Sequence, residues 1–366
     1  MPTETLRPIK LTRGVPPAEA FPTDLIIECC RDALRVFGDT ILQYQPAFGF
    51  APLRHALADE AGVSPEQVIV GNGSIQLLAF LAEAALSPGD TVLVERPSYD
   101  RAITTFRRAG AKVVGIPLEE DGVDLAMFKE VVSSHAPRLF YVIPDFQNPT
   151  GATMSLAKRE AVCELASRYD FLIVEDIPYR KLRYFGKDIA TFRELAPERV
   201  VQLSSFSKLL SPGIRVGWLV GPAELVWRIG KIAEDTYITP NMLGQGIAYE
   251  FLRRGWLTGN LERLKSLYRP RLQAMFEALE RFLPEGKWFK PQGGFFVGLW
   301  LPEGVQAERL AEVASEEGLV LSRSAGFFPD GDPSRFVRLP FCALSEEEIS
   351  EAIKRLARAV SRARGG

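Results

Sequence analysis

The sequence has 366 residues, more than one simple hydrophobic core usually holds, so we expect two domains. Its 44 basic and 46 acidic side chains give a formal net charge of −2, which offers no electrostatic reason to expect nucleic acid or an anionic membrane as a partner. The first residues lack the apolar stretch of a secretory signal, and no apolar run is long enough to span a bilayer. We therefore expect a soluble protein of the cytoplasm.

The four cysteines and two histidines argue against a metal centre. Cys29 and Cys30 are adjacent, the other two cysteines stand alone, and no C-x-x-C spacing or Cys/His cluster occurs. We expect no bound metal and four reduced thiols, as in most cytosolic proteins.

From about residue 68 to residue 220, short apolar runs alternate with segments of helical periodicity. The runs of strand character are 68–70, 91–94, 112–116, 139–143, 171–174, 200–204 and 215–220. Strands that alternate with helices predict an α/β fold of three layers, with a mostly parallel sheet of seven strands. The last strand follows its predecessor too closely for a helical crossover, so we expect it to run antiparallel or at an angle.

The pattern changes after about Tyr268. A long helix is expected at 261–283, a Gly-rich strand at 293–301, a helix at 307–317 and a strand at 335–340. A last helix at 345–364 begins with Ser345 as N-cap and Glu348 in the capping-box position. We expect a large domain at 26–268 and a smaller α+β domain made of 1–25 and 269–366, because the proline-rich first residues have no periodic segment of their own.

Lys208 follows the expected strand 200–204, with hydroxyl groups before it at Ser205 and Ser207 and a guanidinium after it at Arg215. An amine that acts as a nucleophile must be partly desolvated and close to other charges, so that its pKa falls. The hydroxyls and the guanidinium are groups that bind phosphate. Taken alone, however, a lysine in this setting is more often a solvated loop residue.

Gly73, Ser74 and Ile75 open the helix that is expected after strand 68–70. The free backbone N–H groups of such a helix start form an anion site. An ordinary helix N-cap explains the same residues, so the turn is ambiguous by itself.

Two more polar segments follow strands, where ligands bind in open α/β sheets. Asn148 comes after strand 139–143 and precedes a proline, so it either presents its amide to a ligand or belongs to a simple turn. Asp176 and Tyr179 come after strand 171–174. The carboxylate can keep a heterocyclic nitrogen protonated and the phenol can reach the same ring, although an aspartate capping the next helix is an equal alternative.

These segments resemble a known family when they are taken together and in order. N-P-T-G at 148–151, D-x-x-Y at 176–179 and S-x-S-K-x-x-x-P-G-x-R-x-G at 205–217 resemble the fold-type-I pyridoxal-phosphate aminotransferases. The similarity is to the branch that contains aromatic and 2-aminoadipate aminotransferases, and its motifs run from Tyr44 to Arg338. The resemblance implies pyridoxal 5'-phosphate as cofactor. It also implies amino transfer between an L-amino acid (aromatic, branched or 2-aminoadipate-like) and a 2-oxo acid such as 2-oxoglutarate.

The resemblance also implies roles for single residues at the cofactor ring. Lys208 is expected to hold the cofactor as a Schiff base and to move the proton between the substrate α-carbon and the cofactor. Asp176 is expected to pair with the pyridine nitrogen, which makes the ring an electron sink. Asn148 and Tyr179 are expected to hydrogen-bond the phenolic oxygen of the ring, and Tyr99 to stack on its face.

By the same resemblance, the phosphate is bound by Gly73, Ser74, Ile75, Ser205, Ser207 and Arg215, and by Tyr44 from a neighbouring subunit. Each active site is then built from both chains of a homodimer.

Arg338 matches the arginine that binds the substrate α-carboxylate, with Arg335 as a competitor three residues earlier. Asn148 is expected to share this contact, and Gly14 to lay its backbone over the substrate. Arg13 departs from the small residue that relatives often have here. It either meets an acidic substrate side chain or is a solvated arginine, and both alternatives stay open.

Two other functions compete with amino transfer. A C–S β-lyase on the same fold would use the same lysine and aspartate. The fold also occurs as the effector-binding half of transcription regulators. Such a protein would need a basic winged-helix domain before the Arg13–Gly14 motif, for which we expect no room, and the net charge also argues against DNA binding.

Overall fold

The computed structural model describes residues 7–333 and 335–364. Its largest element is an eight-stranded sheet with the strand order β2-β9-β8-β7-β6-β3-β4-β5. The strands are β2 (Val68–Gly71), β3 (Thr91–Arg96), β4 (Lys112–Glu119), β5 (Gly122–Val123), β6 (Leu139–Val142), β7 (Leu172–Asp176), β8 (Val200–Ser205) and β9 (Gly217–Val220). Strands β4, β3, β6, β7 and β8 are parallel neighbours, and β9 pairs antiparallel with β8 as expected. The predicted strands are all present, and β5 is a further strand of two residues at one edge.

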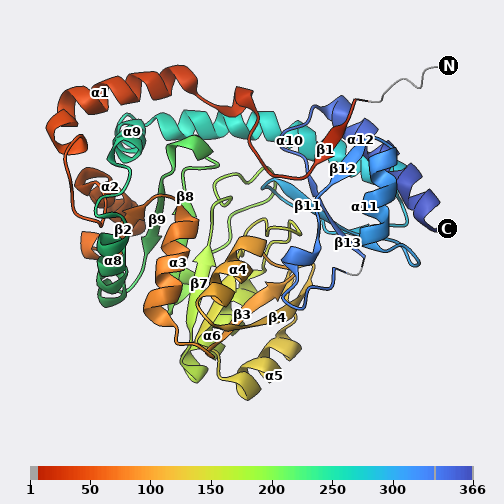
Figure 1. The fold of residues 1–366 in the computed structure, drawn as a ribbon, viewed down its shortest axis with the longest axis horizontal. Helices are drawn as coiled ribbons and strands as arrows, with labels where there is room; N and C mark the ends of the chain where they lie inside the picture. Colours follow the sequence, from red (N-terminus) through yellow and green to blue (C-terminus); the bar gives the residue numbers. More distant parts are fainter. Residues whose placement is uncertain (1–6, 334, 365–366) are drawn as a thin grey trace.

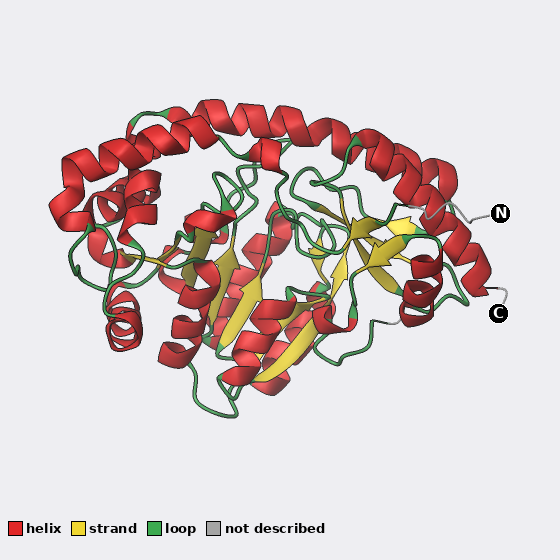
Figure 2. Ribbon diagram, turned by 45° about the horizontal axis from the view of Figure 1, so that its top comes forward, coloured by secondary structure: helices red, strands yellow, loops and turns green. Residues whose placement is uncertain are grey.

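Helices cover both faces of this sheet and form the expected three layers (Figures 1 and 2). One face carries α3 (Ser74–Ala85), α4 (Asp100–Arg108) and α8 (Ala223–Tyr237), and the other carries α5 (Leu125–His135), α6 (Leu156–Tyr169) and α7 (Phe192–Leu195). Alternate residues of one strand enter the two cores: Val92 and Val94 pack with α3 and α4, whereas Leu93 packs with α5 and α6. Helices α1 (Thr23–Ile41), α2 (Ala51–Ala61) and α9 (Met242–Arg253) form a third core against β2 and β9.

The rest of the described chain forms two small sheets beside the large one (Figure 1). Strands β10 (Lys287–Trp288), β11 (Phe296–Trp300) and β13 (Phe336–Pro340) are antiparallel, and β1 (Ile9–Leu11) pairs in parallel with β12 (Leu319–Leu321). Helices α10 (Trp256–Phe282), α11 (Ala307–Glu316) and α12 (Glu346–Arg364) pack on them. The N-terminal segment therefore packs on the C-terminal part of the chain. The division into two domains stays a prediction, and its expected boundary after Tyr268 lies inside α10.

Local sequence explains where the elements begin. Before α12, Ser345 Oγ accepts a hydrogen bond from Glu348 N at 3.2 Å and Ser345 N donates to Glu348 Oε2 at 3.0 Å, so the predicted capping box is present. Strand β11 begins at Phe296, later than residue 293, because Gly293 and Gly294 pass close to Phe146 and Gly294 has a φ of +72°.

Gly217 brings β9 against the start of α3. A Cβ on Gly217 would lie 2.3 Å from Ser74 N and 2.6 Å from the carbonyl carbon of Gly73. Both contacts are with backbone, which cannot rotate away as a side chain can, so only glycine lets the β2–α3 turn lie against β9.

We expect Gly217→Ala to force this turn away from β9 and to lower the free energy of unfolding by about 1–3 kcal/mol, the usual cost of overpacking. The matched control is Gly213→Ala, because a Cβ there would meet only Ser211 Oγ at 3.5 Å. Urea denaturation of the two variants checks this prediction. Equal midpoints for both variants would contradict it.

Candidate active site

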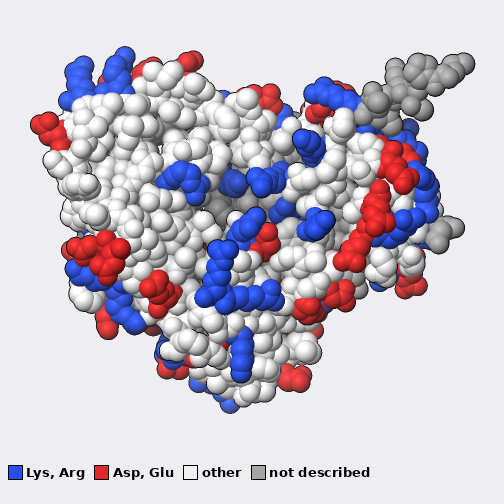
Figure 3. All heavy atoms as spheres, in the orientation of Figure 1, with Lys and Arg blue, Asp and Glu red and all other residues white. Residues whose placement is uncertain are grey.

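A cavity of about 210 Å³ lies at the carboxyl ends of β6, β7 and β8. It brings together most of the residues singled out in the sequence: Gly73, Ser74, Ile75, Tyr99, Asn148, Asp176, Tyr179, Ser205, Ser207, Lys208 and Arg215. On the face drawn in Figure 3, Lys and Arg side chains surround a hollow in the middle of the molecule. The carboxyl edge of the parallel strands is therefore where the predicted site residues meet.

One end of the cavity is built to hold an anion. Gly73 precedes α3 with a φ of +99°, and no side chain caps the first turn of this helix. Arg215 lies directly beside it, since a Cβ on Gly73 would be 2.4 Å from Arg215 Nη2. That guanidinium is fixed by hydrogen bonds to Asn72 O at 3.1 Å and Pro212 O at 3.3 Å. Free helix N–H groups, a guanidinium and the hydroxyls of Ser205 and Ser207 are a donor set that suits phosphate.

Asp176 presents a carboxylate to the same cavity. Its Oδ2 accepts a hydrogen bond from Tyr141 at 2.7 Å, but its Oδ1 is buried and has no partner among the described residues. Burial raises the pKa of Asp176 to about 6, although the bond from Tyr141 opposes this shift. A protonated ring nitrogen of a ligand would give the free oxygen a donor and favour the charged carboxylate.

Lys208 lies in the cavity with its amine close to aromatic rings. Nζ donates a hydrogen bond to Gly14 O at 3.1 Å and lies 5.9 Å from the ring centre of Tyr179 and 5.5 Å from that of Phe295. Burial lowers the pKa of Lys208, and the positive charges of Arg338 and Arg215 lower it further, against an opposing effect of Cys342. A lysine whose neutral form is favoured in this way is suited to act as a nucleophile and as a base.

Arg338 approaches this cavity from β13. Its Nη1 donates to Asn148 Oδ1 at 3.0 Å and its Nη2 to Thr12 O at 2.8 Å, while Nε is buried without a partner among the described residues. The rings of Phe296 and Phe327 lie 4.7 Å and 4.5 Å from the guanidinium carbon. The guanidinium is thus held in one orientation with unused donor capacity, which suits a carboxylate. Arg335 is half-buried just before the strand, and only Arg338 bonds to Asn148.

Asp145 is a buried residue that sequence reasoning missed. Its Oδ1 accepts from Arg159 and Arg183 and its Oδ2 from Arg180, each at 3.0 Å. Asp145 stands three residues before Asn148, and Arg180 directly follows Tyr179, so the network ties together the two segments that carry these side chains. The three arginines have no shared motif in the sequence, and only the fold brings them to one carboxylate.

Tyr141 and Phe296, one of the two rings beside Arg338, were missed as well. Tyr141 pairs with Val174 across β6 and β7, so its side chain lies on the face of Asp176, two residues further on. The hydrogen bond from Tyr141 to Asp176 could be predicted only if the strand register were known. In the sequence, Tyr141 looks like one more apolar residue of a buried strand.

Tyr44 and Arg13 do not line the cavity. Tyr44 lies between α1 and α2 and is 75% exposed. Arg13 is exposed, and no ion pair to it occurs within residues 7–333 and 335–364. The roles predicted for these two residues therefore stay predictions.

Neither a membrane-spanning helix nor a metal cluster occurs in the described part of the chain. No helix there is long and apolar enough to cross a bilayer. No group of three or more His, Cys, Asp or Glu residues in the same ranges is placed to hold a metal ion.

Known proteins resemble this chain over nearly its whole length. It is 38% identical to the 2-aminoadipate transaminase of Thermus thermophilus, over 97% of this chain and 91% of the relative. It is 35% identical to aromatic-amino-acid aminotransferase 1 of Thermococcus litoralis, over 98% of this chain and 89% of the relative. The solved kynurenine aminotransferase of Pyrococcus horikoshii superposes with a TM-score of 0.94 at 34% identity, covering 98% of this chain and 92% of that one.

A second solved structure carries a ligand. The alpha-aminoadipate aminotransferase of Thermus thermophilus, complexed with N-(5'-phosphopyridoxyl)-L-leucine, has a TM-score of 0.93 and 36% identity, with coverage of 98% and 93%. Residues 8–356 of the present sequence match the family described as aminotransferase class I and II. These matches confirm the family expected from the sequence: the chain belongs to the class I and II aminotransferases.

Proposed function

We propose that this aminotransferase holds pyridoxal 5'-phosphate in the cavity around Lys208. The observation that carries the proposal is the buried Oδ1 of Asp176, which has no partner among the described residues, on a side chain that lines the same cavity as Lys208. The anion end at Gly73 and Arg215 fits a phosphate, and the Asp176 end fits a protonated pyridine nitrogen. The residues present therefore fit this cofactor at both of its charged groups.

The remaining contacts follow from the residues that line the cavity. Ser74, Ile75, Ser205 and Ser207 would bind the phosphate together with Gly73 and Arg215. Asn148 and Tyr179 would hydrogen-bond the phenolic oxygen, and Tyr99 would lie against the ring. Lys208 would link covalently to the carbonyl carbon of the cofactor. When bound, the cofactor supplies an electron sink that stabilises negative charge at the substrate α-carbon.

The protein then has two tasks toward the substrate. Arg338 binds the α-carboxylate through its unused donors, which fixes the orientation of the α-carbon, while Asn148 holds Arg338 in place. Lys208 takes the proton from the α-carbon and returns it, as its lowered pKa allows. Gly14 lies over the amine of Lys208 and helps to keep water from it.

We assign as amino donor an L-amino acid with an aromatic, branched or 2-aminoadipate-like side chain, and as acceptor a 2-oxo acid such as 2-oxoglutarate. The similar proteins named above are called aromatic-amino-acid, 2-aminoadipate and kynurenine aminotransferases, and one was solved with a leucine adduct. In the present chain the rings of Phe296 and Phe327 offer apolar contact beside Arg338. Arg13 would extend specificity to acidic side chains.

We also propose that the enzyme is a homodimer. Leu42, Tyr44 and Ile238 are 77%, 75% and 61% exposed, a concentration of apolar surface that an interface would bury. Their two loops are joined, since Thr239 Oγ1 accepts from Gln45 N at 2.9 Å and donates to Gln45 O at 2.7 Å. The second loop also reaches the anion end, where Asn241 N donates to Asn72 Oδ1 at 2.8 Å. In the proposed dimer, Tyr44 contacts the phosphate site of the partner chain from this exposed loop.

We further propose that the enzyme works in the cytoplasm and consists of a large domain at 26–268 and a small domain made of 1–25 and 269–366. All four cysteines are free, as a reducing compartment requires. One hydrophobic core lies on the large sheet and a second surrounds α10 to α12, and the second also takes in Phe146, Tyr179 and Leu209 of the large domain.

Lys208→Ala is expected to remove the visible absorbance of the lysine-linked cofactor and to lower turnover by about 10³-fold or more. In the wild type, L-glutamate should change this absorbance and yield 2-oxoglutarate. Absorbance spectra and product analysis check both expectations, with Lys231→Ala, at an exposed lysine of α8, as the control. A yellow, active Lys208→Ala variant would refute the assignment. Release of ammonia and pyruvate from L-cysteine without amino transfer would point to a β-lyase.

Asp176→Asn is expected to change the pH dependence of stability in the cofactor-free protein. Because burial raises the pKa of Asp176 to about 6, the folded state binds the proton more tightly than the unfolded state does. Wild-type stability should therefore fall as pH rises from about 4 to about 6, by about 2–3 kcal/mol relative to the variant. Urea titrations across this interval test it, with exposed Asp235→Asn as control. If the free energy of unfolding of the variant changes with pH as that of the wild type does, Asp176 does not titrate in this interval.

The shared site predicts complementation between two variants. In a mixed dimer of Lys208→Ala and Tyr44→Ala chains, one site has Lys208 from one chain and Tyr44 from the other, and is therefore intact. Co-expressed chains should then show more activity than either variant alone, measured as amino transfer per purified dimer. If Tyr44 serves its own chain, mixing would add nothing.

A further inference from the structure

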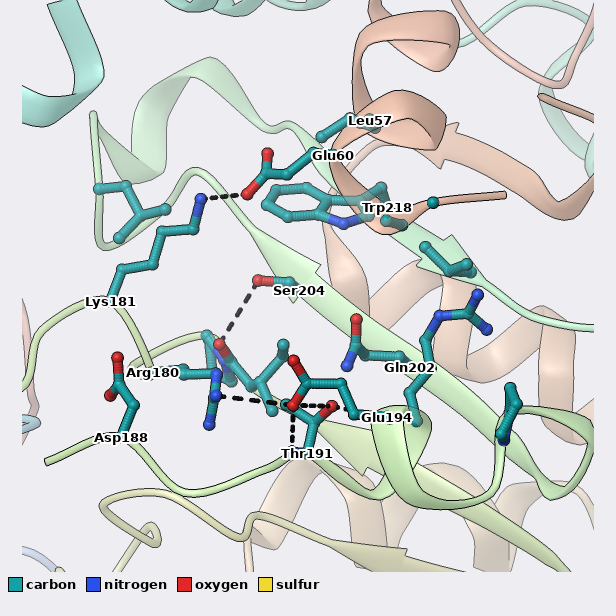
Figure 4. A pocket seen from close by; sticks show the side chains of 18 residues that line it. Leu57, Glu60, Arg180, Lys181, Asp188, Thr191, Glu194, Gln202, Ser204 and Trp218 are labelled. Atoms are coloured by element: carbon teal, nitrogen blue, oxygen red, sulfur yellow. Dashed lines mark hydrogen bonds and ion pairs between the residues drawn. The ribbon is translucent and has the colours of Figure 1, made fainter. Parts of the chain in front are cut away.

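A second cavity, of about 510 Å³, lies on the other face of the large sheet (Figure 4). It is enclosed by α2, by β8 and β9, and by the segment from Ile177 to α7, and we call it the α2–α7 pocket. Along β8, Gln202 and Ser204 line this pocket, whereas Ser205 lines the cofactor cavity. Since neighbouring side chains of a strand point to opposite faces, the sheet separates the two cavities.

Most charged groups of the α2–α7 pocket already have partners. Lys181 forms an ion pair with Glu60 across its mouth (Figure 4). Asp188 pairs with Arg183 at 2.9 Å, and Glu194 caps α7 with Thr191. These groups therefore need no ligand.

Two donors in the pocket have no partner within residues 7–333 and 335–364. Arg193 is half-buried and forms neither a side-chain hydrogen bond nor an ion pair there; burial lowers its pKa, against the opposing charge of Glu175. Trp218 is 9% exposed and lines the pocket, but its indole N–H has no acceptor. The nearby carboxylate of Glu175 is occupied, because it accepts from Phe192 N at 2.8 Å and from Gln202 Nε2 at 2.9 Å.

The wall around Trp218 is apolar, whereas Thr191, Gln202 and Ser204 make another wall polar. Leu57, Leu209 and Val220 line the pocket beside Trp218. A guanidinium and an indole N–H without side-chain partners, beside one apolar wall, suit a ligand with a carboxylate on a compact apolar body.

The pocket shares a wall with the active site. Ile177, Pro178, Arg180 and Lys181 line it, and Pro178 also lines the cofactor cavity together with Tyr179. Arg180 in turn donates to Asp145 Oδ2 at 3.0 Å, in the segment that leads to Asn148. A ligand in the pocket would therefore rest against the segment that follows Asp176 and carries Tyr179.

We propose that the α2–α7 pocket is a second binding site for a small aromatic carboxylate, and that its occupancy alters amino transfer through the Ile177–Lys181 segment. Arg193 binds the carboxylate, the Trp218 N–H donates to it, and the apolar wall takes the ring. The regulatory half of this proposal rests on the proposed function, whereas the binding half does not.

Benzoate binding to the cofactor-loaded protein, measured by titration calorimetry, tests the site. Arg338 also binds carboxylates under the proposed function, so the wild type should bind two benzoates per chain and Arg338→Gln only one. Adding Arg193→Gln to Arg338→Gln should weaken this remaining site at least about tenfold, whereas adding Arg309→Gln, an exposed arginine of α11, should leave it unchanged. Benzamide, which lacks the charge, should bind the remaining site at least about tenfold more weakly than benzoate.

The site is overturned if Arg338→Gln binds no benzoate, or if the double variant binds as tightly as Arg338→Gln. Trp218→Phe guards against a misfolded arginine variant, since it keeps an aromatic ring but removes the N–H together with part of the indole, and it should weaken the remaining site at least about threefold.

Steady-state kinetics test the coupling. Benzoate should change kcat in the wild type at saturating amino donor, whereas in Arg193→Gln it should act on KM alone. A change of kcat that persists in Arg193→Gln would overturn the coupling. Calorimetry measures benzoate binding without turnover. An enzyme inactive in amino transfer could therefore still show benzoate binding to the α2–α7 pocket, and the two results are distinguishable.

Discussion

The fully buried carboxylate of Asp145 fixes the positions of the active-site segments that carry Asn148 and Tyr179. A buried ion pair is favourable only when its geometry is good and its remaining oxygen atoms and N–H groups are also satisfied. Here three guanidinium groups share the two oxygens, and Arg159 also donates to Pro144 O and Met154 O. This network fixes the Asn148 segment against the Tyr179 segment, so Arg338 and the cofactor cavity depend on it although none of its members lines that cavity.

The charged groups that meet in the cavity shift the pKa of Lys208. Lys208, Arg215 and Arg338 are positive groups at one site, and the latter two lower the pKa of Lys208. Among the described residues, Asp176 is the one carboxylate that lines the cavity, and burial disfavours its anionic form. Such a site is short of negative charge, and a phosphate together with a substrate carboxylate would supply it. The same imbalance keeps the lysine amine available as a base.

Much of this site could be predicted from sequence because its residues follow strands. The apolar runs located the parallel strands, and the polar residues directly after them, Asn148, Asp176 and Lys208, had to meet at one edge. Family resemblance was needed to choose Arg338 over Arg335 and to assign chemistry to any of them. The Asp145 network and the Tyr141 bond could not be predicted, since they depend on strand register and on arginines scattered along the chain. The two-residue strand β5 carries no periodicity to detect.

The N-terminal segment has a consequence for substrate entry. Thr12 O accepts from Arg338 and Gly14 O accepts from Lys208, so two main-chain carbonyls satisfy the groups that would serve the substrate. Of the two, Thr12 O competes with the substrate, because a substrate carboxylate has to displace it from Arg338 or share its donors. Once Lys208 is linked to the cofactor, the Thr12 contact still satisfies the buried cation of Arg338, and part of the substrate's intrinsic affinity is spent on releasing it. The apparent affinity would thus be set partly by how firmly β1 is held by β12.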